Sequence, residues 1–97
     1  MDVDGDVDWS HGEAHMWAKH GVTVAEANEA LEDPDRVLIQ PDYNSKSGSS
    51  DRVIGYSRSY GDLLSVILVR HQDTLYGSNG WRSNSKDRAI YSEGSQS

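Results

Sequence analysis

The sequence predicts an α+β domain: two N-terminal helices packed on an antiparallel β-sheet of three to four strands, followed by a short C-terminal helix. Three observations carry this prediction. Two helix-start motifs flank a glycine within residues 10–33. Residues 36–82 then show the alternation of apolar and polar residues that is typical of strands. Turn-forming residues separate these strands, and segregated helices and strands of this kind indicate an α+β fold.

The two helices are predicted from the residues at their ends. Ser10 with Glu13, and Thr23 with Glu26, match the S/T-x-x-E capping box, in which each side chain bonds the other residue's backbone amide. Gly21 is expected to end the first helix, because glycine readily adopts the left-handed conformation found there. The Pro34 that follows Asp33 is expected to end the second.

The strands are predicted from period-two segments bounded by turns. Residues 63–70 are the most apolar segment and are therefore expected to form the central strand. The remaining expected elements are strands at 36–40, 51–58 and 74–82, the last interrupted by residues 77–80, a short edge strand at 7–9 and a helix at 86–93. The expected core residues are Val22, Ala27, Leu31, Ile39, Ile54, Leu64, Val66 and Leu68.

Length and composition indicate one small domain. The 97 residues leave no room for a second core, and residues 1–6 and 93–97 are expected to be frayed tails. The absence of cysteine excludes disulfides and thiolate chemistry. No apolar segment is long enough to span a membrane, and the N-terminus is acidic rather than a basic secretory leader, so a cytoplasmic location is expected.

The charge is distributed unevenly along the chain. Residues 1–35 carry ten acidic residues and one basic residue, whereas residues 36–97 carry six acidic and eight basic residues, for a net charge of −7. Because acidic surfaces repel phosphate, a nucleic-acid site is expected on the second part.

One block of residues resembles a known family. Lys19-His20-Gly21-Val22-Thr23 is followed by Glu26, and the same order of elements continues with an early Trp9, a strand holding Arg52 and Gly55, the apolar strand, Arg82 and Tyr91. This pattern resembles the BrnT-type toxins, a branch of the RelE/ParE-like toxins of bacterial toxin–antitoxin pairs, over most of the chain. The last helix departs from the pattern, since it holds only Lys86 and Arg88 as cations and is interrupted by Asp87.

The resemblance implies a RelE-like fold and a metal-independent endoribonuclease that needs no cofactor. It also implies neutralisation by a small DNA-binding antitoxin, with the toxin a monomer alone or a hetero-oligomer with its antitoxin. The acidic balance favours an alternative, a catalytically degenerate module that only binds the antitoxin and takes part in co-repression. An unrelated small binding domain is a third possibility.

Metal-independent RNA cleavage requires a base, an acid and cations around the attacked phosphate. Arginine suits the last role because its planar fork matches phosphate oxygens, and aromatic rings stack on unpaired bases. The candidate catalytic residues are therefore Lys19, His20, Arg52, Arg82 and Tyr91, and the candidate RNA-binding residues are Tyr56, Arg58, Lys86 and Arg88. Each arginine could instead be a solvated surface residue, and Lys19 and His20 could simply stabilise the end of a helix.

Three further patterns bear on metal or partner binding. His11 and His15 flank Glu13 at helical spacing, but no third ligand is evident and no metal site is expected. Asp2, Asp4, Asp6 and Glu13 fit positions of a calcium loop that lacks its obligatory glycine, so an acidic tail is the preferred interpretation. Trp17 and Trp81 are expected to anchor the antitoxin interface, although Trp17 could also belong to the core.

Overall fold

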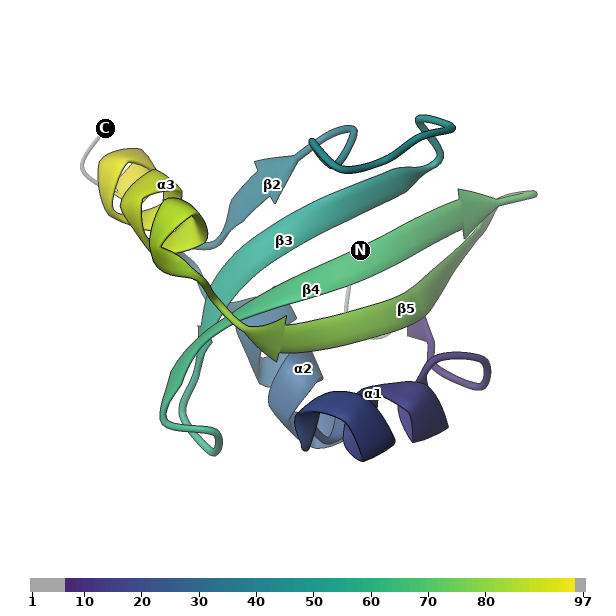
Figure 1. The fold of residues 1–97 in the computed structure, drawn as a ribbon, viewed down its shortest axis with the longest axis horizontal. Helices are drawn as coiled ribbons and strands as arrows, with labels where there is room; N and C mark the ends of the chain where they lie inside the picture. The colour runs from purple at the N-terminus through teal and green to yellow at the C-terminus, as the bar shows by residue number, and fades with distance from the viewer. Residues whose placement is uncertain (1–6, 96–97) are drawn as a thin grey trace.

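The computed structural model describes residues 7–95 as three helices and one five-stranded mixed sheet (Figure 1). The strands lie in the order β1-β5-β4-β3-β2, which confirms the α+β class and the central position of β4. The predicted three to four strands become five because the short edge strand expected at 7–9 joins the same sheet as β1. The elements are β1 Val7–Asp8, α1 Glu13–His20, α2 Val24–Glu32, β2 Val37–Ile39, β3 Ser50–Ser57, β4 Asp62–His71, β5 Thr74–Arg82 and α3 Ser85–Ser95.

The sheet is antiparallel except at one edge, where β1 pairs in parallel with β5. Residues 77–80 were expected to interrupt the last strand, but β5 is continuous and contains a β-bulge. Ile67 pairs with Asn79 and Leu68 with Gly77, so Ser78 is the extra residue. A bulge adds one residue to a strand without ending it, which explains the correction.

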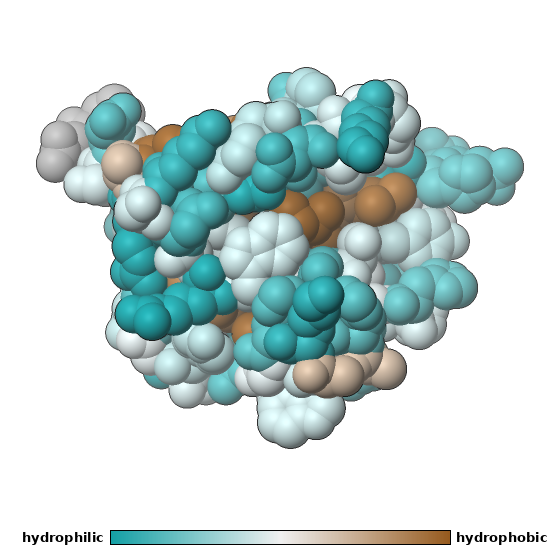
Figure 2. Space-filling view, viewed as in Figure 1, coloured by the Kyte–Doolittle hydropathy of each residue, from teal (hydrophilic) through white to brown (hydrophobic). Residues whose placement is uncertain are grey.

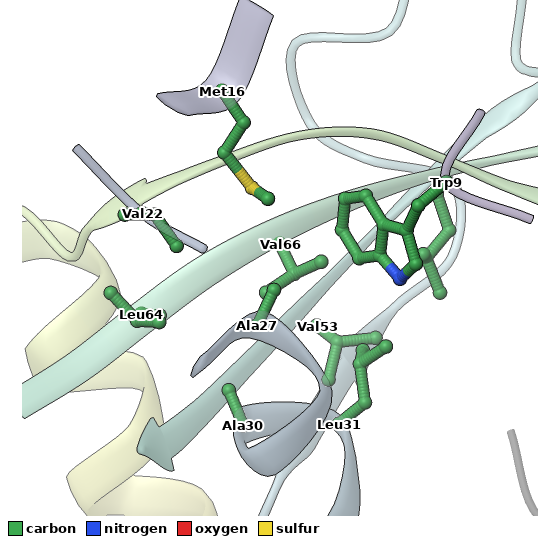
Figure 3. Close-up of a cluster of buried hydrophobic side chains, with 10 residues drawn as sticks. Trp9, Met16, Val22, Ala27, Ala30, Leu31, Val53, Leu64 and Val66 are labelled. Atoms are coloured by element: carbon green, nitrogen blue, oxygen red, sulfur yellow. The ribbon is translucent and has the colours of Figure 1, made fainter. Parts of the chain in front are cut away.

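Helices α1 and α2 pack on one face of the sheet, as predicted (Figure 1). Figure 3 shows α2 side chains directed at the sheet, with Met16 of α1 and Trp9 beside them. The approach of α2 is close, because a Cβ placed on Gly55 would lie 2.0 Å from the carbonyl oxygen of Ala30. The buried cluster on this face contains Trp9, Met16, Val22, Ala27, Ala30, Leu31, Val53, Leu64, Val66 and Leu68.

All the predicted core residues except Ile39 are buried. Ile39 is only half-buried because β2 is a three-residue strand at the edge of the sheet. Ile54 is buried outside this cluster, since it follows Val53 in β3 and successive strand residues point to opposite faces. The second face of the sheet therefore buries apolar surface too.

Helix ends confirm one capping box and correct the other. Thr23 Oγ1 accepts from the amide of Glu26, whose carboxylate accepts from the amide of Thr23, and Gly21 ends α1 with a φ of 66°. The box predicted at Ser10 is wrong, because its hydroxyl donates to Asp8 and Gly12 is the N-cap of α1. Gly12 packs directly on the β5 backbone, which shifts the helix start.

Helix α3 crosses the second face of the sheet over β2 and β3 (Figure 1). Its first turn is capped by Asn84, whose side-chain oxygen accepts from the amide of Asp87 at 2.9 Å. The helix continues to Ser95, into the tail expected from residue 93 on, while residues 1–6 and 96–97 lie outside the described part of the chain. None of the helices within residues 7–95 has the length and apolar content needed to cross a bilayer.

Candidate functional site

The face of the sheet opposite α1 and α2, here called the open face, is covered by α3 at only one end. Figure 2 shows apolar residues gathered over the middle of the sheet on this side, with hydrophilic residues around them. Strand pairing places three sets of side chains there: Arg52 with Ile67 and Asn79, Ser65 with Trp81, and Val69 with Tyr76. The face thus combines apolar, aromatic and polar groups.

Arg52 lies at the covered end of the open face and is almost completely buried, with 2% of its surface exposed. Its Nε donates to Asp42 at 2.7 Å, and its Nη1 donates to Asp87 and to the Tyr43 hydroxyl, also at 2.7 Å. The alternative interpretation of Arg52 as a solvated surface residue is therefore wrong. A guanidinium held by two carboxylates has little positive charge left for phosphate, so its predicted catalytic role stays a prediction that these contacts disfavour.

Asp87 is the other buried charge of this network. Its carboxylate accepts from Ser65 Oγ and from the Tyr43 hydroxyl, each at 2.6 Å, in addition to Arg52. Burial alone would raise the pKa of Asp87, but the hydrogen bonds from Ser65, Tyr43 and Arg52 outweigh burial and lower it. The network joins α3 to the loop after β2 and to two central strands.

A series of rings and cations runs from α3 across the open face to His20 at the end of α1. The Tyr43 ring lies between Lys86 Nζ, at 3.9 Å from the ring centroid, and Arg52 Cζ, at 4.2 Å. Arg52 Cζ lies 5.3 Å from the Trp81 centroid, and the Trp81 ring lies 5.6 Å from that of His20. We call these five residues the aromatic–cation row. The row unites three of the predicted site residues, which come from α1, β3 and α3.

His20 is half-buried at the C-terminal end of α1. Burial lowers the pKa of His20, and the nearby charges of Lys19 and His15 lower it further. The imidazole is therefore mainly neutral at neutral pH and can accept a proton. Lys19, the preceding residue, is exposed. Lys19 and His20 were predicted to act as a pair. Of the two, only His20 contacts the aromatic–cation row, through the Trp81 ring.

Arg82 and Arg88 meet at a single carboxylate. Arg82 Nε and Arg88 Nη2 donate to Asp62 Oδ2 at 2.8 and 2.9 Å. The hydrogen bond from Arg88 and those from the Leu63 amide and Arg82 hold the pKa of Asp62 well below its usual range. The Arg82 side chain remains 67% exposed, so other N–H groups of its fork are accessible to a ligand.

Tyr91, Tyr56 and Arg58 lie in different, acidic surroundings. The Tyr91 hydroxyl donates to Asp33 Oδ2 at 2.7 Å, and burial together with this carboxylate raises the pKa of Tyr91. A phenol held in this way is a poor proton donor to a leaving group. Tyr56 and Arg58 line a pocket of ≈ 340 Å³ together with Glu29, Glu32 and Asp33, whose charges oppose phosphate binding.

Sequence reasoning missed the residues that surround Arg52. Asp42 and Tyr43 fall between the strands predicted at 36–40 and 51–58, and Asp87 was interpreted only as an interruption of a basic helix. One signal was present: Arg52 directly precedes Val53 and Ile54 in a predicted strand, and an arginine that is buried there needs carboxylates as partners.

The histidine pattern on α1 does not gather metal ligands. Across residues 7–95, no group of three or more His, Cys, Asp or Glu side chains is arranged to hold a metal ion. His11 instead lies against Tyr76, with ring centroids 5.5 Å apart. Asp2, Asp4 and Asp6 of the possible calcium loop fall outside the described residues.

No model of a known protein family matches this chain, and no curated protein matches it.

Proposed function

We propose that this chain is the toxin of a bacterial toxin–antitoxin pair, an endoribonuclease that binds single-stranded RNA on its open face and cleaves it without a metal. The aromatic–cation row is the observation that carries the proposal. Proteins bind single-stranded nucleic acid by stacking bases on aromatic rings and neutralising phosphates with nearby cations. The row holds the rings of Tyr43, Trp81 and His20, with Lys86 as its exposed cation. The Lys19–Thr23 motif supports the assignment to the BrnT-type family.

His20 is the group best suited to start the reaction. As a neutral imidazole it takes the proton of a ribose 2′-hydroxyl, whose oxygen attacks the adjacent phosphorus. The new O2′–P bond forms as the P–O5′ bond breaks, and the leaving O5′ takes a proton from water. Cations stabilise the charge that develops on the phosphate oxygens, a role for Arg82, Arg88 and Lys86.

The ion pairs of the candidate cations favour a second function, the catalytically degenerate interaction module. Arg52 is shared by Asp42 and Asp87, and Arg82 and Arg88 share Asp62. A chain whose arginines are neutralised in this way retains less charge for a phosphorane. Under this alternative the protein binds its antitoxin and contributes to co-repression without cutting RNA.

Antitoxin binding is common to both functions. Trp17 of α1 is 60% exposed and Leu38 of β2 is 55% exposed, so each offers apolar surface that a partner can cover. Aromatic side chains of this kind often contribute most of the binding energy of an interface. The partner we propose is the small DNA-binding antitoxin expected for this family.

A cleavage assay separates the two functions. The purified chain is incubated with end-labelled single-stranded RNA in the presence of a chelator, beside His20→Gln and a matched control, Lys46→Gln, in the exposed loop before β3. Cleavage by the wild type and by the control, but not by His20→Gln, supports the endoribonuclease. If the RNA stays intact in several buffers and the chain still binds the antitoxin, the endoribonuclease is excluded and the interaction module is supported.

A further inference from the structure

The open face carries a second aromatic position at the end farthest from α3. Tyr76, His11 and His71 line a pocket of ≈ 360 Å³ with Val69, Gly77 and Ser78. The His11 and Tyr76 rings are inclined at 59° to each other. The rings of Tyr76 and His11, together with the aliphatic side chain of Val69, can pack against one face of a nucleic-acid base. His71 can hydrogen-bond to the edge of that base.

Backbone packing fixes the position of this pocket. The turn before α1 closes with the Gly12 amide donating to the Trp9 carbonyl at 3.2 Å, and Gly12 packs against the backbone of Gly77 and Ser78. His11, within that turn, is thereby held next to Tyr76. The β-bulge at Ser78 separates Tyr76 from the rest of β5.

The spacing between the two aromatic positions matches a short stretch of nucleic acid. Trp81 pairs with Ser65 and Tyr76 pairs with Val69, four residues farther along β4. Four residues of a strand span about 13 Å. A stacked strand advances about 3.4 Å per nucleotide, so this distance corresponds to about four nucleotides. Ile67 and Asn79 lie between the two positions on the same face.

We propose that the pocket at Tyr76 binds a second base of the same RNA strand that stacks at Trp81, so that RNA lies along β4 and β5. This inference rests on the proposed RNA binding and adds the path and the length of the bound strand. The charge of the lining residues agrees with it. Among residues 7–95, no carboxylate lines the Tyr76 pocket, whereas three line the pocket at Tyr56.

Length-dependent binding tests the path. Fluorescence anisotropy is measured with labelled 2′-O-methyl RNA of three and of eight nucleotides, which cannot supply the attacking hydroxyl. Tyr76→Leu keeps apolar volume but removes the stacking ring. Since one base–aromatic stack contributes about 1–3 kcal/mol, we expect Tyr76→Leu to weaken binding of the eight-nucleotide RNA by about 5- to 140-fold. Binding of the three-nucleotide RNA should not change.

Trp17→Ala is the matched control, since it removes an exposed ring from α1, on the other side of the sheet, and should bind both RNAs like the wild type. Trp81→Leu should weaken binding of both. If Trp81→Leu weakens RNA binding but Tyr76→Leu does not, the proposed path along β4 and β5 is overturned, whereas RNA binding on the open face is still supported. If the wild type binds neither RNA, the proposed function and this inference both fail.

A binding experiment with 5′-AMP shows whether the pocket takes a base of an RNA strand or a free nucleotide. Saturable binding of 5′-AMP that Tyr76→Leu abolishes, with RNA affinity independent of length, would assign the pocket to a free nucleotide and overturn the strand path. Weak or absent 5′-AMP binding beside length-dependent RNA affinity supports the path.

Discussion

The guanidinium of Arg52 and the carboxylate of Asp87, 35 residues apart in the sequence, meet at 2.7 Å beneath α3, and both side chains are almost completely buried. The Tyr43 hydroxyl donates to Asp87 and accepts from Arg52, so it is a hydrogen-bonding partner of both charges. Removing one partner of a buried ion pair leaves the other charge uncompensated, and this lowers the stability of the fold by more than the intact pair contributes to it.

Replacing Arg52 should therefore destabilise the fold rather than only reduce activity. We expect Arg52→Met to lower the free energy of unfolding by about 3–5 kcal/mol, because Asp42 and Asp87 lose their common cation. Chemical denaturation followed by circular dichroism measures the change. Arg36→Gln, at an exposed position, is the control and should change stability by less than about 0.5 kcal/mol. A wild-type value for Arg52→Met would show that the buried pair does not hold α3 to the sheet.

Acid should weaken the same network. The folded-state pKa of Asp87 is lowered, so its contribution to stability is complete above the unfolded pKa of about 3.9 and is lost as pH falls through the lower folded value. Denaturation curves between pH 2 and pH 6 should give a free energy of unfolding that is constant at the upper end of this range and declines toward pH 2. Asp33 and Asp62, whose pKa values are also lowered, contribute to the decline. Asp87→Asn should reduce its slope, and an unchanged slope would exclude Asp87 as a source.

If His20 is the general base, cleavage should depend on pH in one direction. The rate should rise with pH as the imidazole loses its proton and reach a plateau, with an apparent pKa below the ordinary value because burial, Lys19 and His15 lower it. His20→Gln should slow cleavage by about 10²- to 10⁴-fold and remove this inflection. Single-turnover rates across pH 4–8 provide the measurement. An inflection that survives in His20→Gln belongs to another group.

Arg82 should affect the rate through its shape as well as its charge. We expect Arg82→Ala to slow cleavage by about 10²- to 10³-fold, since an aligned donor to the developing oxyanion is lost. Arg82→Lys keeps the charge but loses the planar fork, so it should recover only part of the rate. Unfolding curves should match the wild type, because the side chain is largely exposed. Full activity of Arg82→Ala would assign the residue to its ion pair with Asp62 alone.

Trp17 should contribute to partner binding and not to RNA binding. Truncating a central interface aromatic commonly costs more than about 2 kcal/mol of binding free energy. We expect Trp17→Ala to lower the affinity for the protein encoded by the adjacent gene while its melting curve stays close to that of the wild type. Size-exclusion co-elution and calorimetry measure this. Separate elution of the wild-type chain and the neighbour at micromolar concentration would count against an antitoxin partner.

Local features of this protein were readable from sequence because their causes are local. Thr23 and Glu26 are three residues apart and satisfy each other's amides, and Gly21 needs only its own backbone freedom to end α1. Ser10 shows the limit of the same reasoning. Its motif is identical in kind, but packing of Gly12 on β5 moved the helix start and left the serine to bond Asp8.

The candidate site was predictable in its residue types more than in its arrangement. Lys19, His20 and the arginines were identified, yet their partners were not, since Asp42 lies 10 residues from Arg52 and Tyr91 lies 58 residues from Asp33. Nothing in a one-dimensional pattern distinguishes a carboxylate that neutralises an arginine from one that is solvated.

The sequence was enough to predict the α+β class, the central strand, the second helix with its cap, and most of the apolar residues that the helices cover, because periodicity and caps act over a few residues. It was not enough to predict that Arg52 is buried, that Arg82 and Arg88 share Asp62, or that Tyr43, Trp81 and His20 belong to one row, because these depend on long-range contacts. The physical reason is desolvation: the charge that an arginine offers to a ligand depends on which carboxylates folding brings within about 3 Å of it, and those come from distant segments of the chain.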